Sequence, residues 1–146
     1  MSIASVIARI VLVLVMLFGA AGCKGDAERA GADMAAATAG DITYYLQNHV
    51  VTPGASERRQ LGAVRRWLAD PSDGYLNEYP EPMIQVLADG DHKIEIAVYD
   101  YGETPAIDGK DGAWGIACRR YTVDASGQLQ ASSFACPSSL PSRPPY

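Results

Sequence analysis

The sequence contains few of the side chains on which catalytic and metal sites most often depend. It has two histidines, His49 and His92, and three cysteines. No H-x-x-x-H pair is present, so no local zinc motif is predicted. The chain also lacks a G-x-S-x-G nucleophile elbow, a G-x-x-x-x-G-K phosphate loop and a G-x-G-x-x-G turn. We therefore expect no metal and no cofactor, and the sequence favours a non-enzymatic protein.

Basic side chains are in the minority. The chain has 12 Lys and Arg residues against 17 Asp and Glu residues, and its formal net charge is −5. Affinity for nucleic acid comes largely from Lys and Arg contacts to phosphates. Anionic membrane surfaces likewise attract clusters of basic residues. We therefore expect neither a nucleic-acid partner nor polybasic contact with a membrane.

The most apolar part of the chain precedes Cys23. Arg9 stands before the apolar segment Ile10–Phe18, and a positive charge followed by such a segment is typical of a secretory signal peptide. The small residues Ala20, Ala21 and Gly22 before Cys23 resemble the lipobox of bacterial lipoprotein precursors, although Ala20 stands where leucine is usual. This resemblance implies removal of residues 1–22 and a lipid on Cys23. The lipid would hold the protein in the bacterial cell envelope, on the extracytoplasmic side of a membrane.

The alternative is that the same segment is retained as a membrane anchor. Ile3–Ala21 has 19 residues, close to the roughly 20 that a helix needs to span a bilayer. Arg9 inside that span would be unfavourable.

Type IV pilins also combine an N-terminal apolar helix with a sheet and a late disulfide. This chain lacks their Gly-to-Glu processing site, so that likeness concerns the architecture only.

The cysteine count agrees with the lipoprotein interpretation. An odd number of cysteines in an exported protein requires an explanation. If Cys23 carries a lipid, Cys118 and Cys136 remain as an even pair. An oxidising envelope would allow these two residues to form a disulfide.

Behind the signal peptide we predict a tether, one folded domain and a tail. Residues 23–40 are rich in alanine, glycine and charge and read as a tether that becomes helical only toward its end. The domain is expected over residues 41–136. Residues 137–146 contain four prolines and are expected to form a flexible tail.

Hydrophobic periodicity predicts an α+β domain, with two helices packed on an antiparallel sheet of about four strands. Apolar residues recur at helical spacing after Asp41 and again after Ser56, and Pro53-Gly54 and Asp70-Pro71 end these two segments. Two hairpins follow, over residues 83–101 and 114–136. In the first, a three-residue turn sets Ile84 and Val86 on one face with the apolar residues of the next strand. In the second, Trp114, Ile116, Cys118, Phe134 and Cys136 share a face.

Residues 102–113 read as a long polar loop between the hairpins. It lacks the ligand spacing and the closing Glu of an EF-hand, so no calcium site is predicted.

The leading hypothesis is a non-enzymatic envelope lipoprotein that binds a protein or a small ligand. The alternative is a small envelope hydrolase or an inhibitor-type protein that uses the acidic segment 99–111. The candidate binding residues are Asp100, Tyr101, Glu103, Asp108 and Asp111.

Overall fold

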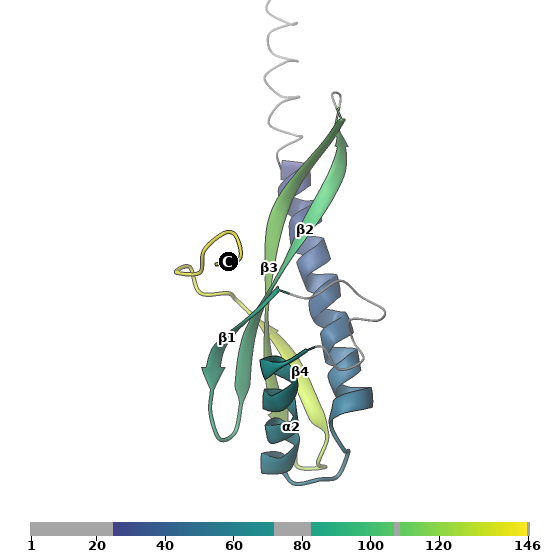
Figure 1. The fold of residues 1–146 in the computed structure, drawn as a ribbon, viewed down its shortest axis with the longest axis vertical. Helices are drawn as coiled ribbons and strands as arrows, with labels where there is room; N and C mark the ends of the chain where they lie inside the picture. The colour runs from purple at the N-terminus through teal and green to yellow at the C-terminus, as the bar shows by residue number, and fades with distance from the viewer. Residues whose placement is uncertain (1–24, 72–82, 107–108, 146) are drawn as a thin grey trace, which may run out of the picture.

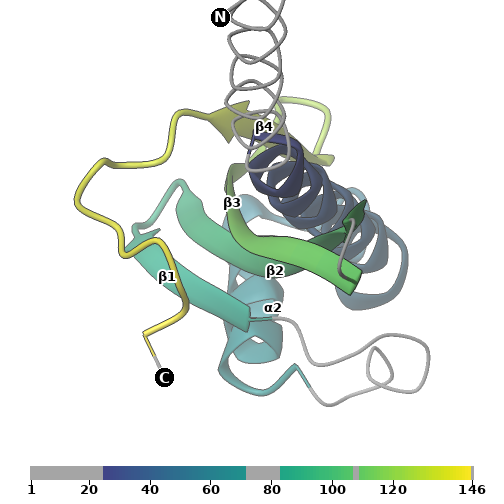
Figure 2. The same cartoon turned by 90° about the horizontal axis from the view of Figure 1, so that it is seen from above.

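The computed structural model describes residues 25–71, 83–106 and 109–145 (Figure 1). Two helical segments cover one face of a four-stranded antiparallel sheet with the strand order β1-β2-β3-β4 (Figure 2). The predicted α+β class is therefore confirmed. The strands are β1 (Met83–Asp89), β2 (Ile94–Ala106), β3 (Gly109–Val123) and β4 (Leu129–Phe134). The signal peptide and Cys23 lie outside the described residues, and no helix within those residues is long and apolar enough to cross a membrane.

The predicted tether is wrong from residue 25 onward. Residues 25–45 form one continuous α-helix, which ends in the π-helical turn η1 (Leu46–Val50). Ala27, Gly31, Ala35 and Ala39 recur every fourth residue and are buried against the rest of the fold. Such small side chains bury little apolar area of their own. Instead, small residues allow the helix backbone to lie close to the sheet.

The main core lies between the two helical segments and the sheet. The second helix, α2 (Glu57–Ala69), begins after Ser56 as predicted. Fully or almost fully buried side chains come from both layers: Ile42, Leu46, Leu61, Val64 and Trp67 from the helices, and Ile94, Ile96, Val98 and Tyr121 from the sheet. Burial of one such aliphatic side chain contributes about 1.5–3 kcal/mol. The helices and the sheet thus depend on each other for stability.

The first hairpin has the predicted facing of its apolar side chains, but its strands pair in a different register from the one that a three-residue turn would give. Ile84 pairs with Val98, and Val86 pairs with Ile96. The turn differs, because Asp89 pairs with Ile94 and leaves residues 90–93 between the strands instead of three residues. A register shift between Val86 and Ala88 restores the expected faces. Val86 nevertheless remains 47% exposed on this edge strand.

The predicted polar loop over residues 102–113 is also wrong. These residues form the far ends of β2 and β3, in which Gly102 pairs with Ala113 and Glu103 pairs with Gly112. β1 pairs with β2 only as far as Tyr99, so the β2–β3 hairpin extends beyond it (Figure 1). We call this extension, residues 100–106 and 109–117, the ribbon. The N-terminal helix packs directly on it, because Gly102 and Gly115 leave room for the helix backbone at Ala30 and Gly31.

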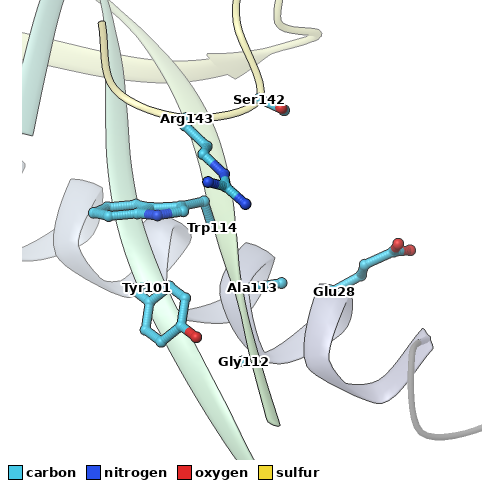
Figure 3. A pocket seen from close by; sticks show the side chains of 7 residues that line it. All are labelled: Glu28, Tyr101, Gly112, Ala113, Trp114, Ser142 and Arg143. Atoms are coloured by element: carbon cyan, nitrogen blue, oxygen red, sulfur yellow. The ribbon is translucent and has the colours of Figure 1, made fainter. Parts of the chain in front are cut away.

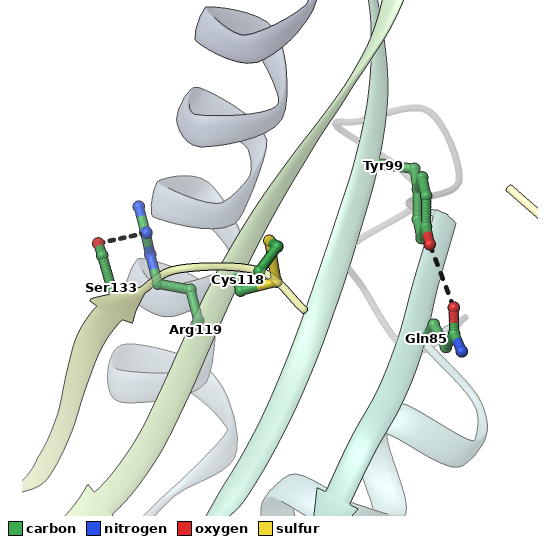
Figure 4. Close-up of a disulfide and its surroundings, with 6 residues drawn as sticks. Gln85, Tyr99, Cys118, Arg119 and Ser133 are labelled. Carbon is green, nitrogen blue, oxygen red and sulfur yellow. Dashed lines mark hydrogen bonds between the residues drawn. A yellow bond between two sulfur atoms is a disulfide. The ribbon is translucent and has the colours of Figure 1, made fainter. Parts of the chain in front are cut away.

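The predicted disulfide is present. Cys118 pairs in register with Phe134, and its bond to Cys136 joins Cα atoms 5.4 Å apart (Figure 4). Beyond Cys136 the described part of the predicted tail packs against the fold. Leu140 packs against the cluster on the outer face of the sheet, opposite the helices, and its N–H donates to the carbonyl of Pro137 at 3.1 Å. We call residues 137–145 the C-terminal segment.

Candidate functional site

The predicted acidic residues that the structure describes do not converge. Asp100 faces the N-terminal helix and accepts a hydrogen bond from the Thr38 hydroxyl. Glu103 lies on the opposite side of β2 by strand alternation, and its carboxylate pairs with Lys110 at 2.8 Å. Asp111 accepts a hydrogen bond from the backbone N–H of Gly112 at 2.9 Å. Asp108 lies outside the described residues.

Neither histidine joins the acidic residues of the ribbon. His92 precedes the opposite end of β2, where its exposed ring lies 3.1 Å from the Glu57 carboxylate. His49 is exposed and contacts the ring of Tyr45, with the ring centroids 4.9 Å apart. Within the described residues, no group of three or more His, Cys, Asp or Glu side chains could hold a metal ion. The structure therefore pairs neither histidine with a described acidic residue of the ribbon.

An aromatic pair marks a different site on the ribbon. Tyr101 of β2 pairs across the strands with Trp114 of β3, and their rings meet edge to face with centroids 5.6 Å apart. Tyr101 is 42% exposed. Its ring lies over Gly112, where an added Cβ would be 2.6 Å from the Tyr101 Cζ atom. Gly112 thus provides the space that lets the tyrosine ring lie flat across the ribbon.

The aromatic pair lines a cavity of about 590 Å³, which we call the ribbon groove (Figure 3). Its lining comes from four parts of the chain: Glu28 of the N-terminal helix, Tyr101 of β2, Gly112, Ala113 and Trp114 of β3, and Ser142 and Arg143 of the C-terminal segment. The disulfide at Cys136 and the packing of Leu140 hold the C-terminal segment near the sheet. The groove therefore depends on residues that are distant in sequence.

Opposite charges flank the ribbon groove. Figure 3 shows the Arg143 guanidinium extending toward the groove beside Trp114, while Glu28 lies across β3 on the helix. Within the described residues, neither side chain forms an ion pair. The nearby Glu103 carboxylate is paired, and its hydrogen bond raises the pKa of Lys110. Glu28 and Arg143 thus remain available to charged groups of a ligand.

Of the predicted binding residues that the structure describes, only Tyr101 lines the groove. Sequence reasoning placed Trp114 on the correct sheet face but did not join it to Tyr101, although antiparallel pairing across a continuous hairpin would have done so. Glu28 was assigned to the tether and Arg143 to the flexible tail. For these two residues the sequence offers no local signal, because their positions result from packing.

A second cavity is smaller and less suited to a ligand. It measures about 140 Å³ and lies between α2 and the first hairpin, beside the ion pair of Arg65 and Asp89. Ligand sites usually measure about 300–1,000 Å³. The ribbon groove falls within this range, whereas the second cavity falls below it.

No known protein family, curated protein or solved structure matches this chain. The candidate site is therefore defined by its own geometry and chemistry alone.

Proposed function

We propose that this protein is a non-enzymatic binding module of the bacterial cell envelope, held at a membrane by a lipid on Cys23. The ribbon groove is its binding site for an envelope protein or a small ligand. The observation that carries the proposal is the aromatic pair Tyr101–Trp114, which lines a cavity together with Glu28 and Arg143, two charged residues that form no ion pair with any other described residue.

The chemistry of the groove suits recognition. Aromatic side chains offer large apolar contact areas and also carry a polar edge or hydroxyl. Tyr, Trp and Arg are enriched among the residues that contribute most to binding energy. Glu28 and Arg143 add charges of opposite sign that can orient a ligand. The groove thus combines an apolar surface with a small number of charged contacts.

The hydrolase alternative has less support. A glycosidase needs two carboxyl groups on either side of the scissile bond. Asp100 faces the helix and is bonded to Thr38, while Glu103 is paired with Lys110 on the other face. His92 lies beyond the far end of β2. The acidic segment therefore does not supply such a pair among its described residues.

The membrane location is supported by the sequence and agrees with the disulfide. The residues before Cys23 resemble a lipobox. The bond between Cys118 and Cys136 is of the kind that persists in oxidising compartments such as the bacterial periplasm.

A site-specific photocrosslinker tests the proposal in intact cells. We expect the full-length chain with a benzoylphenylalanine at position 101 to form a discrete adduct after irradiation. Tyr44 is 65% exposed on the N-terminal helix and provides a matched control position. Gel and mass analysis identifies the adducts. The assignment of the groove would be refuted by the same adducts at positions 101 and 44, or by no adduct at position 101.

A further inference from the structure

One edge of β3 is open beside the ribbon groove. β3 pairs with β2 from Gly109 to Tyr121, whereas its pairing with β4 begins only at Cys118 and Phe134. Within the described residues, the ribbon part of β3, residues 109–117, therefore has a strand on one side only. In antiparallel pairs, backbone groups of alternate residues point away from the partner strand. The open edge thus presents N–H and C=O groups that can pair with another strand.

The ribbon groove lies along this edge. Gly112, Ala113 and Trp114 of β3 line it, Glu28 lies on the helix side, and Arg143 lies on the outer side (Figure 3). The matching edge of β2 is less suitable, because Pro105 lacks a backbone N–H and Pro is typical of protected strand edges. The open edge of β3 is therefore the better place for an added strand.

We propose that the open edge of β3 binds an extended segment of another protein as an additional β-strand. This inference rests on the proposed binding function and specifies the ligand. Side chains of a strand alternate between the two faces of the sheet. A complementary segment therefore carries an acidic residue on the face toward Arg143 and a basic residue on the face toward Glu28. An apolar residue two positions from the acidic one would lie over Trp114.

The same charges disfavour a second copy of this chain as the occupant. Two identical sheets that join edge to edge through a two-fold axis keep their outer faces on the same side. Arg143 would then lie on the same face as Arg143 of the second copy, and Glu28 on the same face as its counterpart. Juxtaposed like charges are unfavourable at an interface. A heterologous segment with segregated charges avoids this repulsion.

The test uses the full-length chain in detergent and two synthetic octapeptides of equal composition. The first alternates glutamate and valine on one face with lysine and threonine on the other, and the second mixes Glu and Lys on both faces. Trp114 fluorescence reports binding, because Trp67, the other tryptophan of the chain, is only 5% exposed. We expect the first peptide to bind at least tenfold more tightly than the second. We also expect it to slow amide hydrogen exchange within residues 109–117.

Charge reversal identifies the contacts. Arg143→Glu should weaken binding of the first peptide at least tenfold, and a peptide with lysine in place of each glutamate should regain affinity for this variant. Arg58→Glu provides the matched control, because Arg58 is exposed on α2 and the change in net charge is the same. We expect this control to bind like the wild type.

Several results would overturn strand addition. They are equal affinity for the two peptides, equal effects of Arg143→Glu and Arg58→Glu, and unchanged exchange within residues 109–117. Dimers of the free chain that dissociate when the first peptide is added would identify a second copy as the occupant instead. A specific crosslink at position 101 combined with failure of the peptides would refute strand addition while leaving the proposed function supported.

Discussion

Replacing Gly31 with alanine should destabilise the protein, whereas the same substitution at Gly40 should stabilise it. Both glycines lie in the helix of residues 25–45. A Cβ atom at Gly31 would lie 3.0 Å from the backbone nitrogen of Gly115 and still closer to the carbonyl oxygen of Ala113. At Gly40 it would meet nothing within 4 Å. The two variants therefore share the change in helix propensity and differ in packing.

The expected magnitudes follow from these contacts. Alanine is favoured over glycine in a helix interior by about 1 kcal/mol, so Gly40→Ala should raise the free energy of unfolding by about that amount. Overpacking costs about 1–3 kcal/mol. The cost of Gly31→Ala should lie at the upper end of this range, because the added Cβ would overlap atoms of the β3 backbone, which cannot rotate away. The net loss for Gly31→Ala is then about 2 kcal/mol.

Thermal unfolding followed by circular dichroism measures both effects. With a shift of roughly 4 °C for each kcal/mol in a domain of this size, Gly40→Ala should melt about 4 °C above the wild type and Gly31→Ala about 8 °C below it. Urea titrations check that both variants unfold in a single transition. If Gly31→Ala melted at or above the wild-type temperature, the close contact between helix and ribbon would be refuted.

Three further predictions concern the disulfide, the β3–β4 turn and the anchor. Changing both Cys118 and Cys136 to serine should lower the free energy of unfolding by about 2–5 kcal/mol; a thiol assay of the unreduced protein that finds both thiols free, or an unchanged melting temperature, would contradict this. Hydrogen bonds from the Ser126 hydroxyl and the Gln128 backbone hold the pKa of Asp124 below its ordinary value of 3.8. The resulting stabilisation is complete above that pH and is lost as the pH falls through the lower pKa of the folded state. Asp124→Ala should therefore have a lower melting temperature than the wild type at pH 7. Thermal unfolding at pH 3 should show a smaller difference between the two proteins. Cys23→Ser should abolish labelling by a palmitate analogue. A retained anchor helix would be supported instead if the wild type were unlabelled and both proteins fractionated with membranes at full precursor mass.

The elements with strong apolar periodicity could be predicted from the sequence. Leu61, Val64 and Trp67 fall on one face of a helix that begins after Ser56, and the structure buries all three. The pairing of Cys118 with Cys136 followed from the cysteine count and from strand alternation, which places both residues on one face of the hairpin. In both cases the determining interactions are local or lie within one hairpin.

The N-terminal helix could not be predicted in this way, because its partners are remote in sequence. Gly31 is buried because Gly102 and Gly115 lie opposite it. Each glycine by itself lowers helix or strand propensity and suggests a loop. Each glycine is unfavourable for its own element, but together the three allow the helix and the ribbon to lie in close contact.

The ribbon groove could not be predicted for a related reason. Tyr101 was identified as a candidate, but its neighbours Glu28 and Arg143 were assigned to segments expected to remain unpacked. The C-terminal segment reaches the groove through the disulfide at Cys136 and through Leu140. A proline-rich composition indicates a segment without regular structure, but it does not indicate whether that segment is held against the fold.

The early start of the packed helix limits how far the site could stand from a membrane. If Cys23 carries the lipid, a single residue separates it from Gly25, where the described helix is already present. An extended chain spans at most about 3.6 Å per residue, and a helix rises about 1.5 Å per residue. Glu28 would then lie within roughly 12 Å of the acylated residue. The linker between the lipid and the folded domain would then be very short. The groove could therefore bind only segments that lie close to the bilayer surface.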